Sequence, residues 1–304
     1  GTLTGHDRPI YDKPISVSIS NDAKTIVSGS YLGTIKVWNL ETGTEIGTFT
    51  GHDTPIITVS ISNDEKTIVS GSSDNTIKVW NLETGTEIGT LTGHYNYVYS
   101  VNISNDSQTI VSGSRDNTIK VWNLETGTEV GTLTGHDNYV YSINISNDSK
   151  TIVSGSRDNT VKVWDMKTGT EIQTIRGHNS PIISVSISDD SKIIVSGSAD
   201  NTIKAWDLET GELISTLTGH DSPVMSVSIS NDSKTIVSGS VDNTIKVWNL
   251  EAEELICTLR GHDSRVNSVS ISNDGKTIVS GSDDDTIKVW NIDFDTEIQT
   301  IRGH

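Results

Sequence analysis

The sequence predicts an all-β protein built from seven repeated units of four antiparallel strands. Val and Ile alternate with small polar residues in runs such as VSVSIS and TIVSGS, which is the period of half-buried strands. No helical period is present. A fixed repeat of this length indicates a repeat architecture. The repeat is marked by all seven tryptophans of the chain, each 42 residues after the last: Trp38, Trp80, Trp122, Trp164, Trp206, Trp248 and Trp290.

The unit that contains Trp122 shows how the strands are assigned. Its alternating runs are separated by short segments rich in Asn, Asp, Ser and Gly, which favour turns. The Asp116-Asn117 pair is a tight-hairpin signal. The predicted turns are 105–107, 116–117 and 124–127, and the predicted strands are 98–104, 109–114, 118–122 and 128–134.

Each four-stranded unit has apolar residues on both faces, so both faces have to be covered. Seven such sheets packed face to face around an axis cover one another, which is the β-propeller solution. An open β-solenoid needs shorter repeats and parallel strands, and hairpin turns at every junction argue against it. We therefore expect residues 1–304 to form a single seven-bladed propeller.

Composition narrows the range of partners. The net charge is −18 and the pI about 4.7, which disfavours nucleic acid. Cys257 is the single cysteine, so neither an internal disulfide nor a four-cysteine zinc site is possible. No stretch is apolar for long enough to span a membrane. We expect a soluble cytoplasmic protein without a cofactor, monomeric as an isolated domain. The sequence begins in mid-repeat, as a piece of a longer regulatory protein would.

The repeat resembles the WD-repeat family of β-propellers in its letters. Gly-His, then Ser-Gly-Ser-x-Asp-Asn, then Ile-Lys-Val-Trp-Asn/Asp recurs over almost the whole chain. In that family a His, a turn Asp, a strand Ser and the Trp form a buried hydrogen-bonded tetrad. The resemblance implies two sets here: His94, Ser112, Asp116 and Trp122, and His136, Ser154, Asp158 and Trp164.

Ser, His and Asp on one rim are also the constellation of nucleophilic hydrolases. The set recurs in at least six units where an enzyme needs one, and the Trp indole engages the Ser. A structural role, in which buried polar groups satisfy one another, is therefore favoured. The Gly-rich Ser-Gly-Ser segment precedes a strand rather than a helix, so it is a weak phosphate loop.

The first unit departs most from the pattern. Four extra residues lie between His6 and Val17, and Tyr31-Leu32-Gly33 replaces the turn that holds Asp in other units. Residues 1–6 and 296–304 both match a fourth strand, and both would pair beside Trp290. Because the second segment is longer, we expect Thr296 to Arg302 to complete the last blade, with Thr2 to Thr4 displaced.

If the shared letters specify the fold, function should lie where the copies differ. In the family, the third and fifth residues after each His and the residue before the turn Asp point off the face that partners use. The resemblance thus predicts a partner surface made of Tyr97, Tyr99, Arg115, Tyr139, Tyr141, Arg157, Ile57, Ile183 and Met225. Equivalent positions elsewhere carry Lys13, Ile15, Tyr31, Pro55, Ser73, Pro181, Ala199, Pro223, Val241, Arg265, Asn267 and Asp283.

Tyr and Arg are enriched at interface hot spots, and exposed aliphatic residues favour a partner over solvent. We therefore expect a non-catalytic scaffold or sensor module that binds a protein or peptide on this rim. A recent duplication of units three and four would also copy the tyrosines, and the two explanations are compatible. A glycan-binding propeller is the alternative, because tyrosine faces also stack on sugars, and an enzyme comes third.

Overall fold

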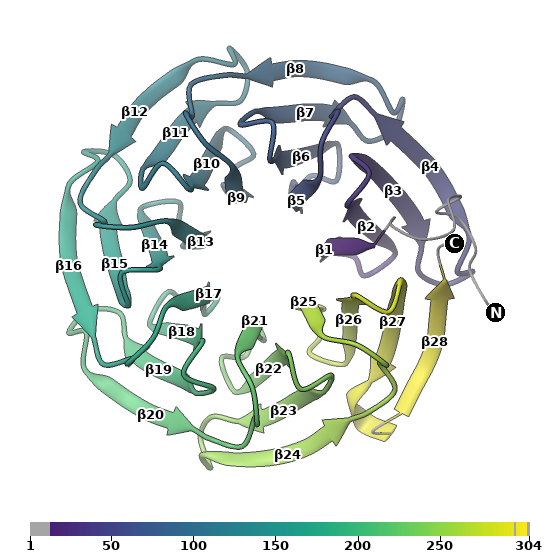
Figure 1. Ribbon diagram of the computed structural model, residues 1–304, viewed down its shortest axis with the longest axis vertical. Helices are drawn as coiled ribbons and strands as arrows, with labels where there is room; N and C mark the ends of the chain where they lie inside the picture. Colours follow the sequence, from purple (N-terminus) through teal and green to yellow (C-terminus); the bar gives the residue numbers. More distant parts are fainter. Residues whose placement is uncertain (1–12, 295, 303–304) are drawn as a thin grey trace.

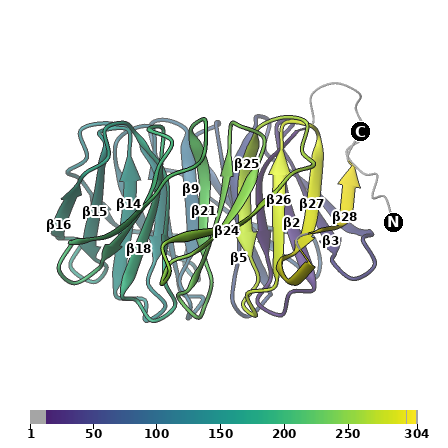
Figure 2. The ribbon, with the colours of Figure 1, turned by 90° about the horizontal axis from the view of Figure 1, so that it is seen from below.

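The computed structural model describes residues 13–294 and 296–302 of the chain. Over these residues the strands form seven four-stranded antiparallel sheets. The sheets stand as blades around a central opening (Figure 1), and the ring is a shallow disc in side view (Figure 2). The all-β, seven-bladed propeller predicted from the sequence is confirmed.

Blades one to four follow one another along the chain, with the first strand of each nearest the axis. Their strands are β1 (Pro14–Ile19), β2 (Thr25–Ser30), β3 (Thr34–Asn39), β4 (Glu45–Thr50), β5 (Ile56–Ile61), β6 (Thr67–Ser72), β7 (Ile77–Asn81), β8 (Glu87–Leu91), β9 (Val98–Ile103), β10 (Thr109–Ser114), β11 (Ile119–Asn123), β12 (Glu129–Leu133), β13 (Val140–Ile145), β14 (Thr151–Ser156), β15 (Thr160–Asp165) and β16 (Glu171–Arg176).

Blades five to seven repeat the same order, and a short 3₁₀ helix, η1 (Ile292–Phe294), precedes the last strand. Their strands are β17 (Ile182–Ile187), β18 (Ile193–Ser198), β19 (Ile203–Asp207), β20 (Leu213–Leu217), β21 (Val224–Ile229), β22 (Thr235–Ser240), β23 (Ile245–Asn249), β24 (Glu254–Leu259), β25 (Val266–Ile271), β26 (Thr277–Ser282), β27 (Thr286–Asn291) and β28 (Thr296–Arg302).

The hydrophobic core lies between blades rather than inside them. One cluster joins Val69 and Ile77 of blade two to Val98, Ile110 and Trp122 of blade three, all buried. The glycine of each Ser-Gly-Ser run permits this close packing. A Cβ on Gly113 would come within 2.7 Å of Val140 Cγ1 in the next blade, closer than two carbon atoms can lie.

A ring of hydroxyl groups ties the inner strands together. In every blade, one Ser or Thr of the inner strand accepts a hydrogen bond from a backbone N–H of the next blade, at 3.0 to 3.2 Å. Val17 N donates to Ser268 Oγ, so the ring also closes between blades seven and one. The accepting residues are Ser16, Thr58, Ser100, Ser142, Ser184, Ser226 and Ser268.

The outer strand of the last blade is β28, which pairs antiparallel with β27 from Asn291↔Thr296 to Thr286↔Arg302. The expectation that Thr296 to Arg302 completes this blade is confirmed. Thr2 to Thr4 and His6 lie outside the described residues.

Asparagines at the rim opposite the tetrad turns connect neighbouring blades. Asparagines that follow the inner strands bond from blade to blade: Asn21 to Asn63, Asn63 to Asn105, Asn105 to Asn147, and Asn147 to Asp189. This ladder lies around a pocket of about 170 Å³ at that end of the ring.

Thr58 offers a test of the interblade hydroxyl ring. Thr58→Val keeps the shape of the side chain but leaves the buried Val101 N–H without an acceptor, so the free energy of unfolding should fall by about 1 to 3 kcal/mol in a denaturant titration. Thr58→Ser keeps the hydroxyl that the other six blades use, and should retain most of the stability. Equal loss in both variants would show that the hydrogen bond contributes nothing.

Candidate functional site

The tetrad of blade three links four parts of the chain by hydrogen bonds. His94, in the connection that enters the blade, lies 2.8 Å from Asp116 Oδ2 through Nδ1 and 2.7 Å from Ser112 Oγ through Nε2. Trp122 Nε1 donates to the same Ser112 Oγ at 2.9 Å. The β10–β11 turn, strand β10 and strand β11 are thereby held to the segment that leads into β9.

Blade four has the same arrangement. His136 lies 2.7 Å from both Asp158 Oδ2 and Ser154 Oγ, and Trp164 Nε1 donates to Ser154 Oγ at 2.8 Å. The same bonds recur in the remaining blades from two to seven, in the sets His52/Ser70/Asp74/Trp80, His178/Ser196/Asp200/Trp206, His220/Ser238/Asp242/Trp248 and His262/Ser280/Asp284/Trp290.

The chemistry of the tetrad suits a structural role. Burial alone would raise the pKa of Asp116, but hydrogen bonds from His94 and Thr118 outweigh it and hold that pKa well below its usual range. The same balance lowers the pKa of Asp74 to about 2. Ser112 is fully buried, and its oxygen already accepts the indole N–H, so no substrate carbonyl can approach it as a nucleophile requires.

Blade one keeps only part of this pattern in the described residues. Trp38 Nε1 donates to Ser28 Oγ at 3.0 Å, while Leu32 occupies the position of the turn Asp. The turn itself is preserved. Gly33 has φ +80°, and Asn117 at the equivalent place has φ +70°, a left-handed conformation that Gly and Asn tolerate.

Each blade has a lysine two residues before its Trp, and the partner of this lysine differs between blades. In five blades its Nζ pairs with a Glu of the outer strand, as Lys120 does with Glu129 at 2.8 Å. In blades five and six a leucine, Leu213 or Leu255, stands opposite the Trp instead. Burial lowers the pKa of His178, Asp200 opposes this shift, and the charge of Lys204 adds to it.

A β-bulge at the start of each inner strand defines the mouth of the central opening. The register shifts between residues 14 and 16 in blade one and at the equivalent place in every other blade. A bulge re-aims the extra side chain, and these seven side chains all line one pocket. We call them the mouth ring: Ile15, Ile57, Tyr99, Tyr141, Ile183, Met225 and Asn267.

Each blade presents two more variable residues beside its mouth-ring residue. The backbone N–H before the turn Asp donates to the carbonyl of the residue two places before the bulge, as Arg115 N does to Tyr97 O at 2.9 Å. The same bond joins Arg157 N to Tyr139 O. The three positions identified from the sequence are thus held together in each blade by the backbone.

The tyrosines and arginines of blades three and four form one cluster. Arg115 lies 5.1 and 5.0 Å from the ring centroids of Tyr97 and Tyr139, and Arg157 lies 5.1 Å from the centroid of Tyr139. Tyr99 and Tyr141 are 5.2 Å apart. We call this set the Tyr–Arg cluster: Tyr97, Tyr99, Arg115, Tyr139, Tyr141 and Arg157.

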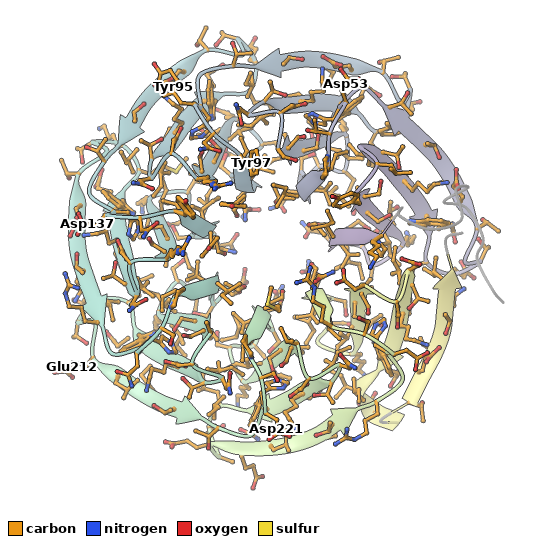
Figure 3. The ribbon with its side chains drawn as sticks, in the orientation of Figure 1. Asp53, Tyr95, Tyr97, Asp137, Glu212 and Asp221 are labelled. Atoms are coloured by element: carbon orange, nitrogen blue, oxygen red, sulfur yellow. The ribbon has the colours of Figure 1, made fainter. Side chains whose placement is uncertain are left out.

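The pocket enclosed by the mouth ring has a volume of about 670 Å³. Its aliphatic side contains Ile57, Ile183 and Met225, and its other side contains Tyr99, Tyr141 and Arg157. Figure 3 shows Tyr97 beside the central opening, whereas Tyr95, Asp53, Asp137 and Asp221 lie farther out. Six of the nine partner-surface residues predicted from the sequence thus line this pocket. The other three, Tyr97, Arg115 and Tyr139, lie next to it in the Tyr–Arg cluster.

Other features bear on the kinds of site that the chain offers. The described residues contain no group of three or more His, Cys, Asp or Glu side chains arranged to hold a metal ion. Within the same part of the chain, no helix is both long and apolar enough to cross a bilayer.

Sequence reasoning missed the bulge, the interblade hydroxyl ring and the Lys–Glu pairs. Pro181, Ala199 and Arg265 also line the pocket. They were placed on the rim by the resemblance but not assigned to the partner surface. Their 42-residue spacing from the tyrosine and arginine positions was the available signal.

A repeated His, Asp, Ser and Trp network on a seven-bladed ring defines a class of propeller. The model of the WD domain, G-beta repeat family matches residues 1–39, 43–81, 85–123, 127–165, 169–207, 211–249 and 253–291. The chain belongs to this family, whose propellers are commonly protein-interaction scaffolds and generally non-catalytic. A search of curated proteins found no matching relative.

Trp122 tests the structural role of the tetrad. Trp122→Ala should lower the free energy of unfolding by about 3 to 5 kcal/mol through lost packing, in addition to the lost indole hydrogen bond. Trp122→Phe keeps an aromatic ring and should lose less. A thermal melt that is unchanged by Trp122→Ala would refute the structural role.

Leu213 tests whether the absence of a glutamate beside Lys204 contributes to the low pKa of His178 in blade five. Because the pKa of His178 lies below 6.5, the free energy of unfolding should fall as the pH drops below about 6.5 and level off once the folded pKa is passed. Leu213→Glu places a carboxylate beside Lys204 and should raise the pKa of His178 in an NMR titration of the imidazoles. The uncharged variant Leu213→Gln should leave the pKa of His178 unchanged. Equal shifts in the two variants would contradict this explanation.

Proposed function

We propose that this protein is a non-catalytic interaction module that binds a protein or peptide over the mouth ring and the Tyr–Arg cluster. The observation that carries the proposal is the contrast within one pocket. Its aliphatic residues come from blades one, two, five and six, its tyrosines and Arg157 come from blades three and four, and blade seven adds Arg265 and Asn267. A partner that offers both kinds of contact fits this surface.

The Tyr–Arg cluster has the properties of an interface hot spot. Rigid tyrosines stacked with arginines lose little conformational freedom on binding, and such residues often contribute 2 kcal/mol or more each on truncation. Tyr97 is 37% exposed in the free protein, so its ring can still be covered by a partner.

A duplication of blades three and four would copy the tyrosines and arginines, and it is compatible with the proposed binding role. The two copied arginines nevertheless differ in their surroundings, because the next blade offers Tyr139 to Arg115 but Pro181 to Arg157. Identical residues in blades three and four therefore have different neighbours in the folded ring.

The remaining expectations form part of the same proposal. A glycan-binding propeller would present equivalent pockets between blades, whereas the tyrosines cluster in two blades, so a protein or peptide is the better fit. The buried tetrad serines support a non-catalytic role. The net charge of −18 supports a partner other than nucleic acid, and we place the protein in the cytoplasm as a monomer.

The test is a selection of a random peptide library displayed on phage against the immobilised wild-type protein. Recovered peptides should bind the wild type and lose binding to the variant Tyr99→Ala/Tyr141→Ala/Arg157→Glu, because the variant removes two aromatic contacts and reverses one charge. A pull-down with the same two proteins extends the test to whole partners.

Lys150→Glu is the matched control, because Lys150 is an exposed cation in the turn between β13 and β14, at the opposite end of the blade. It should bind the peptides as the wild type does. Peptides that bind the triple variant equally well would refute the proposed surface. A glycan array that labels the wild type but not the triple variant would favour the sugar-binding alternative.

A further inference from the structure

The pocket at the mouth ring is lined by positive charge, although the protein as a whole is strongly negative. The chain carries a net charge of −18, yet the residues that line the pocket include two arginines, Arg157 and Arg265, and no carboxylate. At physiological ionic strength, charges beyond about 8 Å are largely screened. The local cations therefore decide which ligand charge is favoured inside the pocket.

The two arginines of the pocket differ in what neutralises them. Arg265 Nε lies 2.6 Å from Asp283 Oδ2, and Asn267 also donates to Asp283. For Arg157, the described part of the chain offers no ion pair. Its guanidinium lies against Tyr139 on one side, and its exposed side faces the pocket.

The neighbouring Arg115 is not equivalent to Arg157. Two tyrosine rings cover its guanidinium, and within the described residues its Nε is buried without a hydrogen-bond partner. The stack of alternating rings and guanidinium groups ends at Arg157 because blade five supplies Pro181 and Ala199 at the next positions. Arg157 is thus the one uncompensated cation among the described residues that line the pocket.

The surface beside Arg157 is aliphatic. Ile183, Met225 and Ile57 are each half-buried around the same pocket, so an apolar side chain that enters there removes further apolar area from water. A bidentate guanidinium-carboxylate contact is among the stronger polar contacts. It would lie within the same cavity as this aliphatic wall.

We infer that the partner is an acidic peptide segment that places one Asp or Glu carboxylate against Arg157 and an adjacent aliphatic side chain against Ile183 and Met225. This inference rests on the proposed function and names the chemistry of the partner. The carboxylate belongs at the centre of the face, because exposed aspartates such as Asp53, Asp137 and Asp221 lie toward its edge.

The experiment uses oriented peptide pools with one fixed residue, Glu, Gln or Lys, followed by a fixed Leu, and measures affinity for the intact protein by fluorescence polarisation. The Glu pool should bind the wild type about tenfold more tightly than the Gln pool, as expected for one hydrogen-bonded charge contact. The Lys pool should bind weakest.

Variants of the pocket identify which residue contacts the carboxylate of the peptide. Arg157→Gln should abolish the preference for Glu over Gln, and Arg157→Lys should keep most of it. Arg265→Gln is the matched control, since this arginine is already paired, and the preference should remain. Ile183→Ser should weaken the Glu and Gln pools by the same factor.

The outcomes separate the two levels of the proposal. If no pool binds, the proposed function itself fails. If the Glu and Gln pools bind equally, or the Lys pool binds best, the acidic partner is refuted while peptide binding stands. Loss of the preference in Arg265→Gln but not in Arg157→Gln would refute the role of Arg157. Tighter binding by a pool with fixed phosphoserine than by the Glu pool would refute the carboxylate.

Discussion

The hydrogen-bonded tetrad of His, Asp, Ser and Trp is the interaction on which the rest of the structure depends. It joins the chain entering a blade to the turn and the two strands on which that blade is built, as in the bonds from His94 to Asp116 and Ser112. The entering segment then has only a few residues before the inner strand, and the bulge at Tyr99 lies at the start of that strand. The tetrad therefore fixes the position of the bulge, and the bulge aims one variable side chain of each blade at the central opening.

This arrangement separates scaffold from surface. The shared residues are buried: Ser112 accepts a hydrogen bond from Trp122, whose ring packs against the preceding blade, and Gly113 lets the next blade approach closely. The variable residues need only be compatible with a bulge and a turn, so they can change without disturbing the core. Blades three and four use this freedom for tyrosine and arginine, and the neighbouring blades use it for aliphatic residues. One pocket thereby acquires two chemically different halves.

Much of this organisation could be predicted from the sequence, because a fixed period exposes it. The spacing of Trp80, Trp122 and Trp164 was enough to predict blades, and alternation of Val and Ile was enough to predict strands. The tetrad followed from family resemblance rather than from periodicity. The hydroxyl ring could not be foreseen, because Ser100 and Ile143 are far apart in sequence and meet only after two blades pack. The different surroundings of Arg115 and Arg157 were hidden for the same reason: their sequence contexts are almost identical.

The central claim is that a partner occupies the mouth ring, and the methionines of the chain provide a direct measurement. The protein has two: Met225 lines the pocket, and Met166 packs against the core between blades three and four. With ¹³C-labelled methionine methyl groups, addition of a peptide recovered from the phage selection should shift the Met225 resonance and leave that of Met166 in place. A bound peptide that leaves Met225 unchanged, or shifts only Met166, would contradict the account.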